Sequence, residues 1–578
     1  MNHQQLRPSQ FITTYGPGSI IETRSGPVVI STVDNVFSDN NLALADFEIR
    51  DARLITSPLL NGAGIVRIPV NAEIRREEDY PLYRSEQLPY WSLCVEHRIL
   101  YLNRRRCPQC PPATVTFDRE KAGREAIRFV RVCTNGHLDD VDWHYVVHNG
   151  PRCANQPDYY RWQGGGGSLR NVTIQCPNCG APPVNFGTAY SRDWPCSERY
   201  PERGPRPNQP ACAAPARIVQ RGAANLRLPE LVSALTIPPL ASRLTTVLQD
   251  TRIMTLCGML LSRNMLTETE FRQSLGYVQP PLSQAVLQFL QQCSWAEIEQ
   301  AIPQVIGTAS GAGRSLKEDE FNSLRYAATY GAPPVSAPQI GAPPLFEVRL
   351  SELRRFYGPA RRYLLRIVPV SRLRMVMVQL GYRRLDPPNA LLVPVSFQSG
   401  DRAWYPGVEL FGEGIFLDLE DADLDLSGTR FPSWLQSYNS TPTDETLHPV
   451  HVWWHTFSHR LLRALSIDSG YSSASIRERV FLHRQTNGPT RGGLLLYTVQ
   501  PGGDGTLGGL LALARNFDQV IAAALRDVNS CSNDPLCEEA FPSGINGAAC
   551  YSCLLASETS CEQRNIHLDR VLLSENLP

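Results

Sequence analysis

The sequence contains no long apolar run and nothing that reads as an export signal. No stretch of its 578 residues approaches the ~18 consecutive apolar residues that a transmembrane helix needs. The first residues, MNHQQLRPSQFITTYGPGSII, lack the charged start and apolar segment of a secretory signal peptide. These absences argue against membrane and secreted proteins. We therefore expect a cytoplasmic protein with no membrane partner.

A nucleotide-hydrolysing motif and an excess of charge are also missing. The phosphate-binding pattern G-x-x-x-x-G-K-[ST] does not occur, so we expect no ATP hydrolysis by this chain alone. The formal net charge is zero, so the molecule as a whole does not attract nucleic acid. Lysine occurs only at Lys121 and Lys317, so nearly all of the 56 basic residues are arginine. Arginine suits phosphate and carboxylate partners, although the codon usage of a GC-rich genome explains the bias equally well.

Cysteine is abundant by contrast, with 16 residues. In a reducing cytoplasm such clusters are better explained by metal binding or catalysis than by disulfides. Zinc prefers four tetrahedral sulfur and nitrogen ligands, and a C-x-x-C turn brings two thiolates to one ion. Closed sites of this kind stabilise a fold and leave no position for a substrate. We therefore predict three to four structural Zn²⁺ ions.

Four groups of cysteine and histidine have ligand spacing. For the second of the groups given below, an alternative is that Cys133 and His137 complete the site of Cys107 and Cys110. If that group binds no metal, His137 and His148 would simply form hydrogen bonds in loops. We take Cys257 and Cys293 as ordinary buried thiols on helices. The predicted groups are Cys94, His97, Cys107 and Cys110; Cys133, His137, His148 and Cys153; Cys176, Cys179, Cys196 and Cys212; and Cys550, Cys553 and Cys561 with Cys537, or with Cys531 in its place.

The pattern of the chain predicts an α+β, multidomain protein with cysteine-rich zinc-binding insertions, a helical middle region and a mixed α/β C-terminal zinc-binding domain. The cysteine- and proline-rich part should bury little apolar area, so we expect metal to hold it together. The predicted boundaries are 1–90 for a β-containing domain, 91–222 for the cysteine-rich region, 223–330 for helices, 331–345 for the linker around GAPPVSAPQIGAPP, and 346–578 for the C-terminal domain.

The densest basic run, residues 346–384, precedes the acidic run GEGIFLDLEDADLDL. The basic run could follow a DNA backbone, or it could form ion pairs with its acidic neighbour. The three arginines between predicted zinc ligands are further phosphate-binding candidates. The candidate DNA-binding residues are Arg104, Arg105, Arg106, Arg354, Arg355, Arg361, Arg362, Arg372, Arg374, Arg383 and Arg384.

Candidate catalytic features are weaker. His448, His451, His455 and His459 recur at helical intervals, but Thr456 stands where a zinc protease of the H-E-x-x-H type needs its glutamate. Glu413 and the acidic residues after it could in principle hold Mg²⁺ for nuclease chemistry. The glycine-rich loop 502–509 could bind an anion at a helix start. None of these forms a recognisable catalytic constellation, so we predict a protein that is not an enzyme.

Several motifs in the last quarter of the chain carry a family resemblance. The segments HTFSHRLLRALSIDSGYSSASIRERVF, GGLLLYT, GDGTLGGL and CEQRNIHLDR resemble the C-terminal zinc-binding domain of MrfA-type helicases over residues 450–572. The pair His455 and His459, the Gly508-Gly509 turn and the segment 565–570 make the resemblance specific.

The remaining motifs resemble the DrmB components of DISARM anti-phage systems over nearly the full length. They are RPSQFITTYGPGS, RFVRVCTNGHLDDVDW, IVQRGAANLRLPELVSALTIPP, VSRLRMVMVQLGYRR and ELFGEGIFL. His97 occupies a position where the related pattern more often has cysteine, and zinc accepts either ligand.

The resemblance implies a partner and a role. It implies a heterodimer with a separate superfamily 2 helicase of the DrmA type, which would supply the ATPase, and a core complex that binds invading DNA with a 5′ single-stranded overhang. Two alternatives remain open at the level of sequence. One is a metal-dependent nuclease that uses Glu413 or the histidine stripe, which is the set His448, His451, His455 and His459. The other is an assembly scaffold that does not contact DNA.

Overall fold

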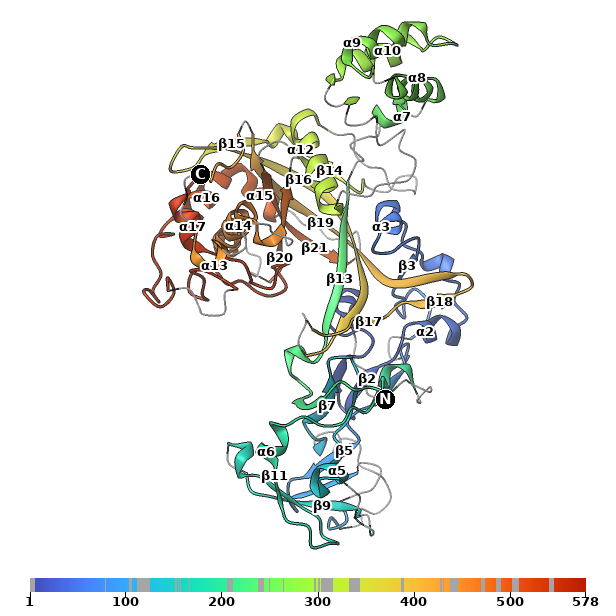
Figure 1. Cartoon of the computed structure of the whole chain (residues 1–578), viewed down its shortest axis with the longest axis vertical. Helices are drawn as coiled ribbons and strands as arrows, with labels where there is room; N and C mark the ends of the chain where they lie inside the picture. The colour runs from blue at the N-terminus through green and yellow to red at the C-terminus, as the bar shows by residue number, and fades with distance from the viewer. Residues whose placement is uncertain are drawn as a thin grey trace. The chain divides into compact units, whose positions relative to one another are not determined.

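The structure forms two compact units that are interleaved along the chain. Unit 1 comprises residues 1–233 and 376–409, and unit 2 comprises residues 234–375 and 410–578. The computed structural model (Figure 1) describes residues 6–77, 80–102, 107–111, 125–150, 153, 155, 157–165, 167–204, 211–237, 244–248, 250–263, 265–295, 298–299, 302, 315–331, 344–385, 389–420, 422–426, 429, 431–436, 445–468, 474–484, 490–501, 509–539 and 545–578.

Unit 1 begins with short strands and helices that match the β-rich pattern of the N-terminal sequence. Strands β1 (Ile20–Thr23), β2 (Gly26–Ile30) and β4 (Ser85–Gln87) form a three-stranded antiparallel sheet in the order β1-β2-β4. Strand β3 (Gly64–Arg67) pairs in parallel with residues Trp404–Gly407. Three short helices accompany them: α1 (Pro8–Thr13), α2 (Asp34–Asp39) and α3 (Ala52–Thr56).

The cysteine-rich part of unit 1 contains two further sheets. One has the order β11-β10-β9-β6-β5 and the other β12-β7-β8. Their bounds are β5 (Trp91–Cys94), β6 (Ile99–Leu102), β7 (Phe129–Cys133), β8 (Leu138–Asp140), β9 (Tyr159–Gln163), β10 (Thr173–Gln175), β11 (Val184–Asn185) and β12 (Ala216–Gln220), with helices α5 (Trp143–His148) and α6 (Phe186–Tyr190).

These sheets enclose an aromatic core that the composition did not suggest. Trp143, Tyr160, Trp162 and Phe186 are buried together, and the Trp143 and Phe186 ring centroids lie 5.6 Å apart. Aromatic side chains bury a large area each, so a few of them give a cysteine- and proline-rich segment a hydrophobic core. The expectation of little apolar burial here was therefore wrong.

Unit 2 is built on long antiparallel strands with helices packed against them. Strands β16 (Leu364–Arg383), β19 (Arg402–Leu419), β21 (Arg491–Pro501) and β20 (Ile476–His483) are neighbours in this order. The pairing of β19 with β21 runs without a shift from Leu410 opposite Pro501 to Asp418 opposite Gly493. The short strands β14 (Glu347–Val348) and β15 (Arg354–Tyr357) pair with β16.

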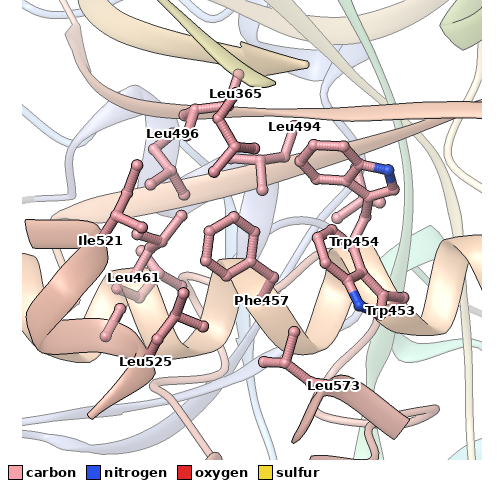
Figure 2. Close-up of a cluster of buried hydrophobic side chains, with 14 of the residues drawn as sticks. Leu365, Trp453, Trp454, Phe457, Leu461, Leu494, Leu496, Ile521, Leu525 and Leu573 are labelled. Atoms are coloured by element: carbon pink, nitrogen blue, oxygen red, sulfur yellow. The ribbon is translucent and has the colours of Figure 1, made fainter. Parts of the chain in front are cut away.

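The central helix of unit 2 is α14 (Pro449–Asp468), shown in orange in Figure 1. Its apolar side chains recur every three or four residues, so one face enters the core. Figure 2 shows Phe457 and Leu461 of this helix against Leu494 and Leu496 of β21. Helices α16 (Phe517–Leu525) and α17 (Arg570–Glu575) complete this core from the C-terminal segment.

A group of short helices forms a second, smaller core in unit 2, as the pattern of the middle region predicts. Cys257 is buried in this core, and burial raises its pKa to about 12, as expected for an ordinary buried thiol. The helices are α7 (Leu244–Leu248), α8 (Thr251–Ser262), α9 (Glu268–Ser274) and α10 (Gln284–Gln292).

Most of the remaining elements are short, and α12 and β13 are the longer ones. Strands β13, β16 and β19 each have residues in both units. The bounds are α12 (Leu316–Tyr330), α13 (Ser433–Gln436), α15 (Gly509–Leu513), β13 (Leu228–Thr236), β17 (Val393–Pro394) and β18 (Phe397–Ser399), with 3₁₀ turns η1 (Leu44–Phe47), η2 (Leu169–Asn171), η3 (Pro201–Arg203), η4 (Ala224–Leu226), η5 (Leu275–Tyr277), η6 (Leu350–Glu352), η7 (Glu445–Leu447) and η8 (Ala514–Asn516).

The architecture confirms the predicted α+β class. Among the described residues, no helix has both the length and the apolar content that crossing a bilayer requires. The proposed boundaries at residues 90, 222, 330 and 345 stay predictions.

A buried ion pair network fixes α12 to the sheet of unit 2. The Asp418 carboxylate accepts hydrogen bonds from Arg366 at 2.7 and 2.9 Å and from Arg325 at 2.9 Å. Arg366 also donates to the Thr329 hydroxyl at 2.7 Å. Burial raises the pKa of Asp418, and the two guanidinium groups oppose that effect. The carboxylate is thus the common partner of two arginines from different elements.

We expect Asp418→Asn to destabilise unit 2 by about 3–5 kcal/mol, because it leaves two partly or fully buried guanidinium groups without a counter-charge. Asp423→Asn is the matched control, since its partner Arg491 is 39% exposed and such pairs contribute about 0–1 kcal/mol. Thermal unfolding followed by tryptophan fluorescence measures both. Equal shifts for the two variants would contradict the assignment.

Candidate metal centres

In the part of the chain that the structure describes, five groups of side chains bring four potential ligand atoms within 4.8 Å of one another. In tetrahedral zinc sites with bonds of about 2.0–2.3 Å, neighbouring ligand atoms lie about 3.3–3.8 Å apart. Four of the groups contain only cysteine and histidine. These are Cys94, His97, Cys107 and Cys110; Cys133, His137, Cys196 and Cys212; His148, Cys153, Cys176 and Cys179; and Cys531, Cys537, Cys550 and Cys553.

The first centre forms where the β5–β6 hairpin meets a C-x-x-C turn. Cys94 ends β5 and His97 lies in the hairpin turn, so both point to the same side. His97 Nδ1 lies 3.5, 3.7 and 3.5 Å from the sulfur atoms of Cys94, Cys107 and Cys110. These are the edge lengths of a zinc tetrahedron. The structure brings this predicted group together as a unit.

The second centre joins the end of β7 to a loop from much later in the chain. His137 Nδ1 lies 3.3 Å from Cys133 Sγ and 3.4 Å from Cys196 Sγ, and the two sulfur atoms are 3.5 Å apart. Gly136 has φ +86° in the turn between the first two ligands, a conformation that favours glycine. Cys212 is the fourth member of this group.

The third centre lies at the end of α5. The His148 ring donates from Nδ1 to the His144 carbonyl at 2.7 Å, which leaves Nε2 facing Cys179 Sγ at 3.5 Å. A histidine ligand held by a backbone carbonyl through its other nitrogen is the usual arrangement in metal sites. A backbone hydrogen bond from Ala181 lowers the pKa of Cys179 to about 7, which favours the thiolate that binds metal.

These two centres group their ligands differently from the sequence prediction. The prediction joined Cys133 and His137 to His148 and Cys153, whereas the structure joins them to Cys196 and Cys212. The alternative in which they complete the site of Cys107 and Cys110 is not found either. Pairing of β12 with β7 sets Ala216 opposite Cys133, which brings the segment after Cys196 to the end of β7. The spacing of ligands along the chain does not predict this pairing between distant strands.

The fourth centre uses four cysteines of the C-terminal segment. Cys531 lies 3.5 Å from Cys550, Cys537 lies 3.6 Å from Cys553, and Cys550 and Cys553 are 3.7 Å apart. Burial alone would raise the pKa of Cys550, but hydrogen bonds from Cys531, the Ser552 backbone and Asn533 lower it to about 6. Both upstream cysteines belong to the group, so the sequence prediction that used only one of them with Cys561 was wrong.

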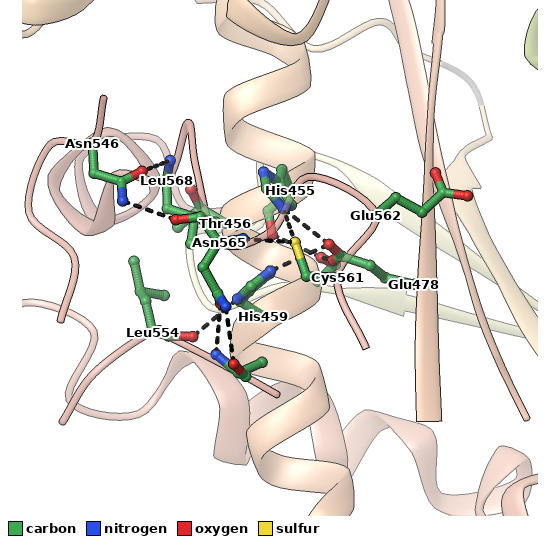
Figure 3. A network of polar contacts seen from close by, with 12 residues as sticks. His455, Thr456, His459, Glu478, Asn546, Leu554, Cys561, Glu562, Asn565 and Leu568 are labelled. Carbon is green, nitrogen blue, oxygen red and sulfur yellow. Dashed lines mark hydrogen bonds and ion pairs between the residues drawn. The ribbon is translucent and has the colours of Figure 1, made fainter. Parts of the chain in front are cut away.

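The fifth group consists of His455, His459, Glu478 and Cys561, all buried (Figure 3). Two of these residues belong to the histidine stripe, and Cys561 was assigned to another centre. Glu478 was not singled out from the sequence. The available signal was its register, because Glu478 falls on the same face of the strand as Ile476 and Val480, and a carboxylate among apolar residues needs a partner.

The predicted DNA-binding arginines lie in different environments. Arg374 and Arg384 are buried, and Arg384 donates to the carbonyls of Gly136, Leu226 and Gly18 at 2.9–3.0 Å. Arg374 donates to the Thr236 hydroxyl at 2.8 Å. Because neither guanidinium is exposed to a phosphate, these two assignments were wrong.

The other candidates divide between paired and exposed side chains. Arg355 pairs with Glu420 at 2.7 Å, which agrees with the ion-paired interpretation of the basic run. Arg372 and Arg383 are half-buried. Arg354, Arg361 and Arg362 are exposed on or beside β15. The residues 104–106 and the glycine loop 502–508 lie outside the described part of the chain.

The acidic residues proposed for a nuclease are engaged elsewhere. Glu413 is 1% exposed and accepts a hydrogen bond from the Leu510 amide at 2.9 Å, at the start of α15. Glu413 and Asp418 are five residues apart in the unshifted part of β19, so they point to opposite faces of the sheet. They therefore do not form a shared Mg²⁺ site.

Comparison with known proteins connects these centres to described families. Residues 7–228 match a domain of unknown function (DUF8724), and residues 457–554 match the MrfA Zn-binding domain. The latter range contains the four cysteines of the fourth centre, and their spacing fits the zinc that the description implies.

Among curated proteins, the DISARM protein DrmB of Bacillus paralicheniformis is 28% identical over 485 residues, which are 78% of this chain and 81% of that protein. The crystal structure of the DUF1998 helicase MrfA bound to DNA matches at 13% identity, with a TM-score of 0.20, over 40% of this chain and 25% of that one. This TM-score is too low to define a shared fold. The resemblance expected from the sequence motifs is confirmed by the similarity to DrmB and by the matched zinc-binding domain.

We expect the ligand grouping to appear in the metal content of paired variants. Cys133→Ser with Cys196→Ser should remove about one zinc ion per chain, because both thiolates serve one centre. Cys176→Ser with Cys196→Ser should remove about two. Cys257→Ser controls for the loss of a buried thiol and should remove none. Elemental analysis of the purified full chain measures these values, and an equal loss for the two pairs would contradict the grouping.

Proposed function

With its similarity to a DISARM protein over most of its length as the premise, we propose that this chain is a non-catalytic component of a bacterial anti-phage defence complex. The single observation that carries the proposal is the 28% identity to DrmB over 78% of the chain. We further propose that it forms a cytoplasmic heterodimer with a superfamily 2 helicase of the DrmA type, and that the pair binds invading DNA.

The chemistry of the chain supports a structural role. The four cysteine and histidine centres each offer a complete set of four ligands, as closed structural zinc sites do. We propose that three to four of them hold zinc, with the ligand sets found together in the structure. The sequence carries no P-loop, so the ATPase of the complex would belong to the partner.

A candidate DNA surface remains after the buried arginines are removed. Arg354, Arg361 and Arg362 are exposed along β15 and the turn that leads into β16. The Arg362 guanidinium lies 5.8 Å from the centre of the Tyr363 ring. This cation–π contact positions the guanidinium and leaves its N–H donors available to a phosphate. Exposed guanidinium groups on one hairpin form the kind of short basic strip that binds phosphates. We propose this strip for DNA with a single-stranded 5′ overhang.

The proposal is tested first by its partner. We expect the tagged full chain, expressed in a bacterium that encodes a complete DISARM system, to recover a superfamily 2 helicase in about stoichiometric amount. Mass spectrometry of the washed complex identifies it. Recovery of the chain alone, with the metal centres intact, would contradict the helicase partnership.

We expect the triple variant Arg354→Glu, Arg361→Glu and Arg362→Glu to weaken DNA binding by the complex and to reduce the salt dependence of its affinity. Each lost phosphate contact should lower the slope of log K against log salt by about 0.7–0.9. Fluorescence anisotropy with an overhang duplex at several salt concentrations measures this slope.

The matched control is Arg50→Glu with Arg217→Glu, which reverses arginines that are 84% and 68% exposed at other sites. An unchanged slope in the triple variant would sink the DNA assignment. Retained helicase binding in that case would support a scaffold that does not contact DNA.

A further inference from the structure

The buried group behind the histidine stripe has the make-up of a metal site. His455 and His459 are four residues apart on α14, so their rings lie on the same face of the helix. Glu478 reaches them from β20, and Cys561 comes from the C-terminal segment. His455 and His459 are fully buried, Glu478 is 1% exposed and Cys561 is 5% exposed. Three separate elements thus meet at these four side chains.

The distances within the group fit a single small cation. His455 Nε2 lies 2.9 Å from Glu478 Oε1 and 3.2 Å from Cys561 Sγ. His459 Nε2 lies 3.2 Å from the same carboxylate oxygen. Mixed nitrogen, oxygen and sulfur ligands of tetrahedral zinc are about 3.2–3.7 Å apart. Two of these distances lie at the lower end of this range, and the distance from His455 to Glu478 is shorter. The four side chains therefore converge on one point, slightly closer together than around a bound zinc ion.

Without a cation, the contact between His459 and Glu478 needs a proton in addition to the one on His459 Nδ1. His459 Nδ1 lies 3.0 Å from the Leu554 carbonyl, which can only accept, so Nδ1 carries the proton. In a neutral ring, Nε2 then presents a lone pair to the Glu478 carboxylate, which is repulsive. The metal-free alternatives place an extra proton on His459 Nε2 or on Glu478 in a fully buried site. A metal ion between the two atoms accepts both lone pairs at once.

Hydrogen bonds with surrounding groups orient three of these four side chains. The Leu554 carbonyl orients His459, and the Ser458 hydroxyl donates to the second oxygen of Glu478. The Asn565 backbone N–H donates to Cys561 Sγ at 3.3 Å. The Glu198 amide does the same to Cys196 at 3.3 Å in the second centre. Such outer contacts orient and tune metal ligands.

We propose that His455, His459, Glu478 and Cys561 bind a fifth, structural Zn²⁺ ion. Two neutral imidazoles, one carboxylate and one thiolate balance a divalent cation, so the filled site is uncharged, as a fully buried site favours. It is separate from the four-cysteine centre, whose ligand set is already complete without Cys561. The ion ties α14 and β20 to the C-terminal segment. This inference does not depend on the helicase or on DNA.

The test is metal content together with metal position in the purified full chain. Crystals of the unmodified protein, measured on both sides of the zinc absorption edge, should show an anomalous peak between the four side chains. This measurement needs no variant, so it remains decisive even if the variants do not fold. Absence of a peak there, while the cysteine centres show theirs, would overturn the proposal. A peak that appears only at the edge of another metal would overturn the assignment to zinc.

Variants supply the second measurement. Glu478→Gln and Cys561→Ser should each remove about one zinc ion per chain, because each removes an anionic ligand. His451→Gln is the matched control, since His451 is buried on the same helix one turn earlier and does not belong to the group. It should leave the zinc content unchanged. Equal zinc content in Glu478→Gln, Cys561→Ser and the control would overturn the proposal.

Discussion

The convergence of thiolate and imidazole groups on shared points holds together the parts of this chain that sequence composition leaves least cohesive. Some of these centres join segments that are far apart in the sequence, such as those of Cys133 and Cys212 in unit 1. Strands β8 to β11 lie between these two cysteines, so this centre joins the two ends of a long segment. A zinc ion bound at such a centre would stabilise the fold, because its binding free energy becomes folding free energy when the unfolded chain lacks the site. The aromatic core around Trp143 then packs on a framework whose ends are already fixed.

In unit 2 one helix has two roles. The apolar face of α14 packs on β21 through Phe457 and Leu461, while His455 and His459 face the polar group around Glu478. A helix turns 100° per residue, so these two faces arise from the same stretch of sequence without conflict. The C-terminal segment closes over both, with the Trp453 indole donating to the Asn576 carbonyl at 2.8 Å. Core packing and the polar group therefore depend on the same docking.

Whether an arginine is buried decides whether it stabilises the fold or can bind a charged ligand. Arg366, Arg384 and Arg361 belong to the same basic run, yet Arg366 pairs with Asp418 and Arg384 donates to backbone carbonyls. These side chains specify how strands and loops meet, because a buried guanidinium without partners costs several kcal/mol. Only the arginines that remain exposed are free to act on a charged ligand. The basic run therefore contains buried arginines that stabilise the fold and exposed arginines that face solvent.

The sequence alone predicted the α+β class, the resemblance to DrmB and most of the cysteines and histidines that the structure gathers into clusters, because residue type and C-x-x-C spacing are local properties. It did not determine how Cys133, Cys196 and Cys531 are grouped, that Glu478 joins the histidines, or that Arg374 and Arg384 are buried. Those outcomes depend on strand pairing and helix docking between residues tens to hundreds of positions apart. Only the tertiary structure brings such residues within bonding distance, since local spacing carries no record of which distant strand becomes a neighbour.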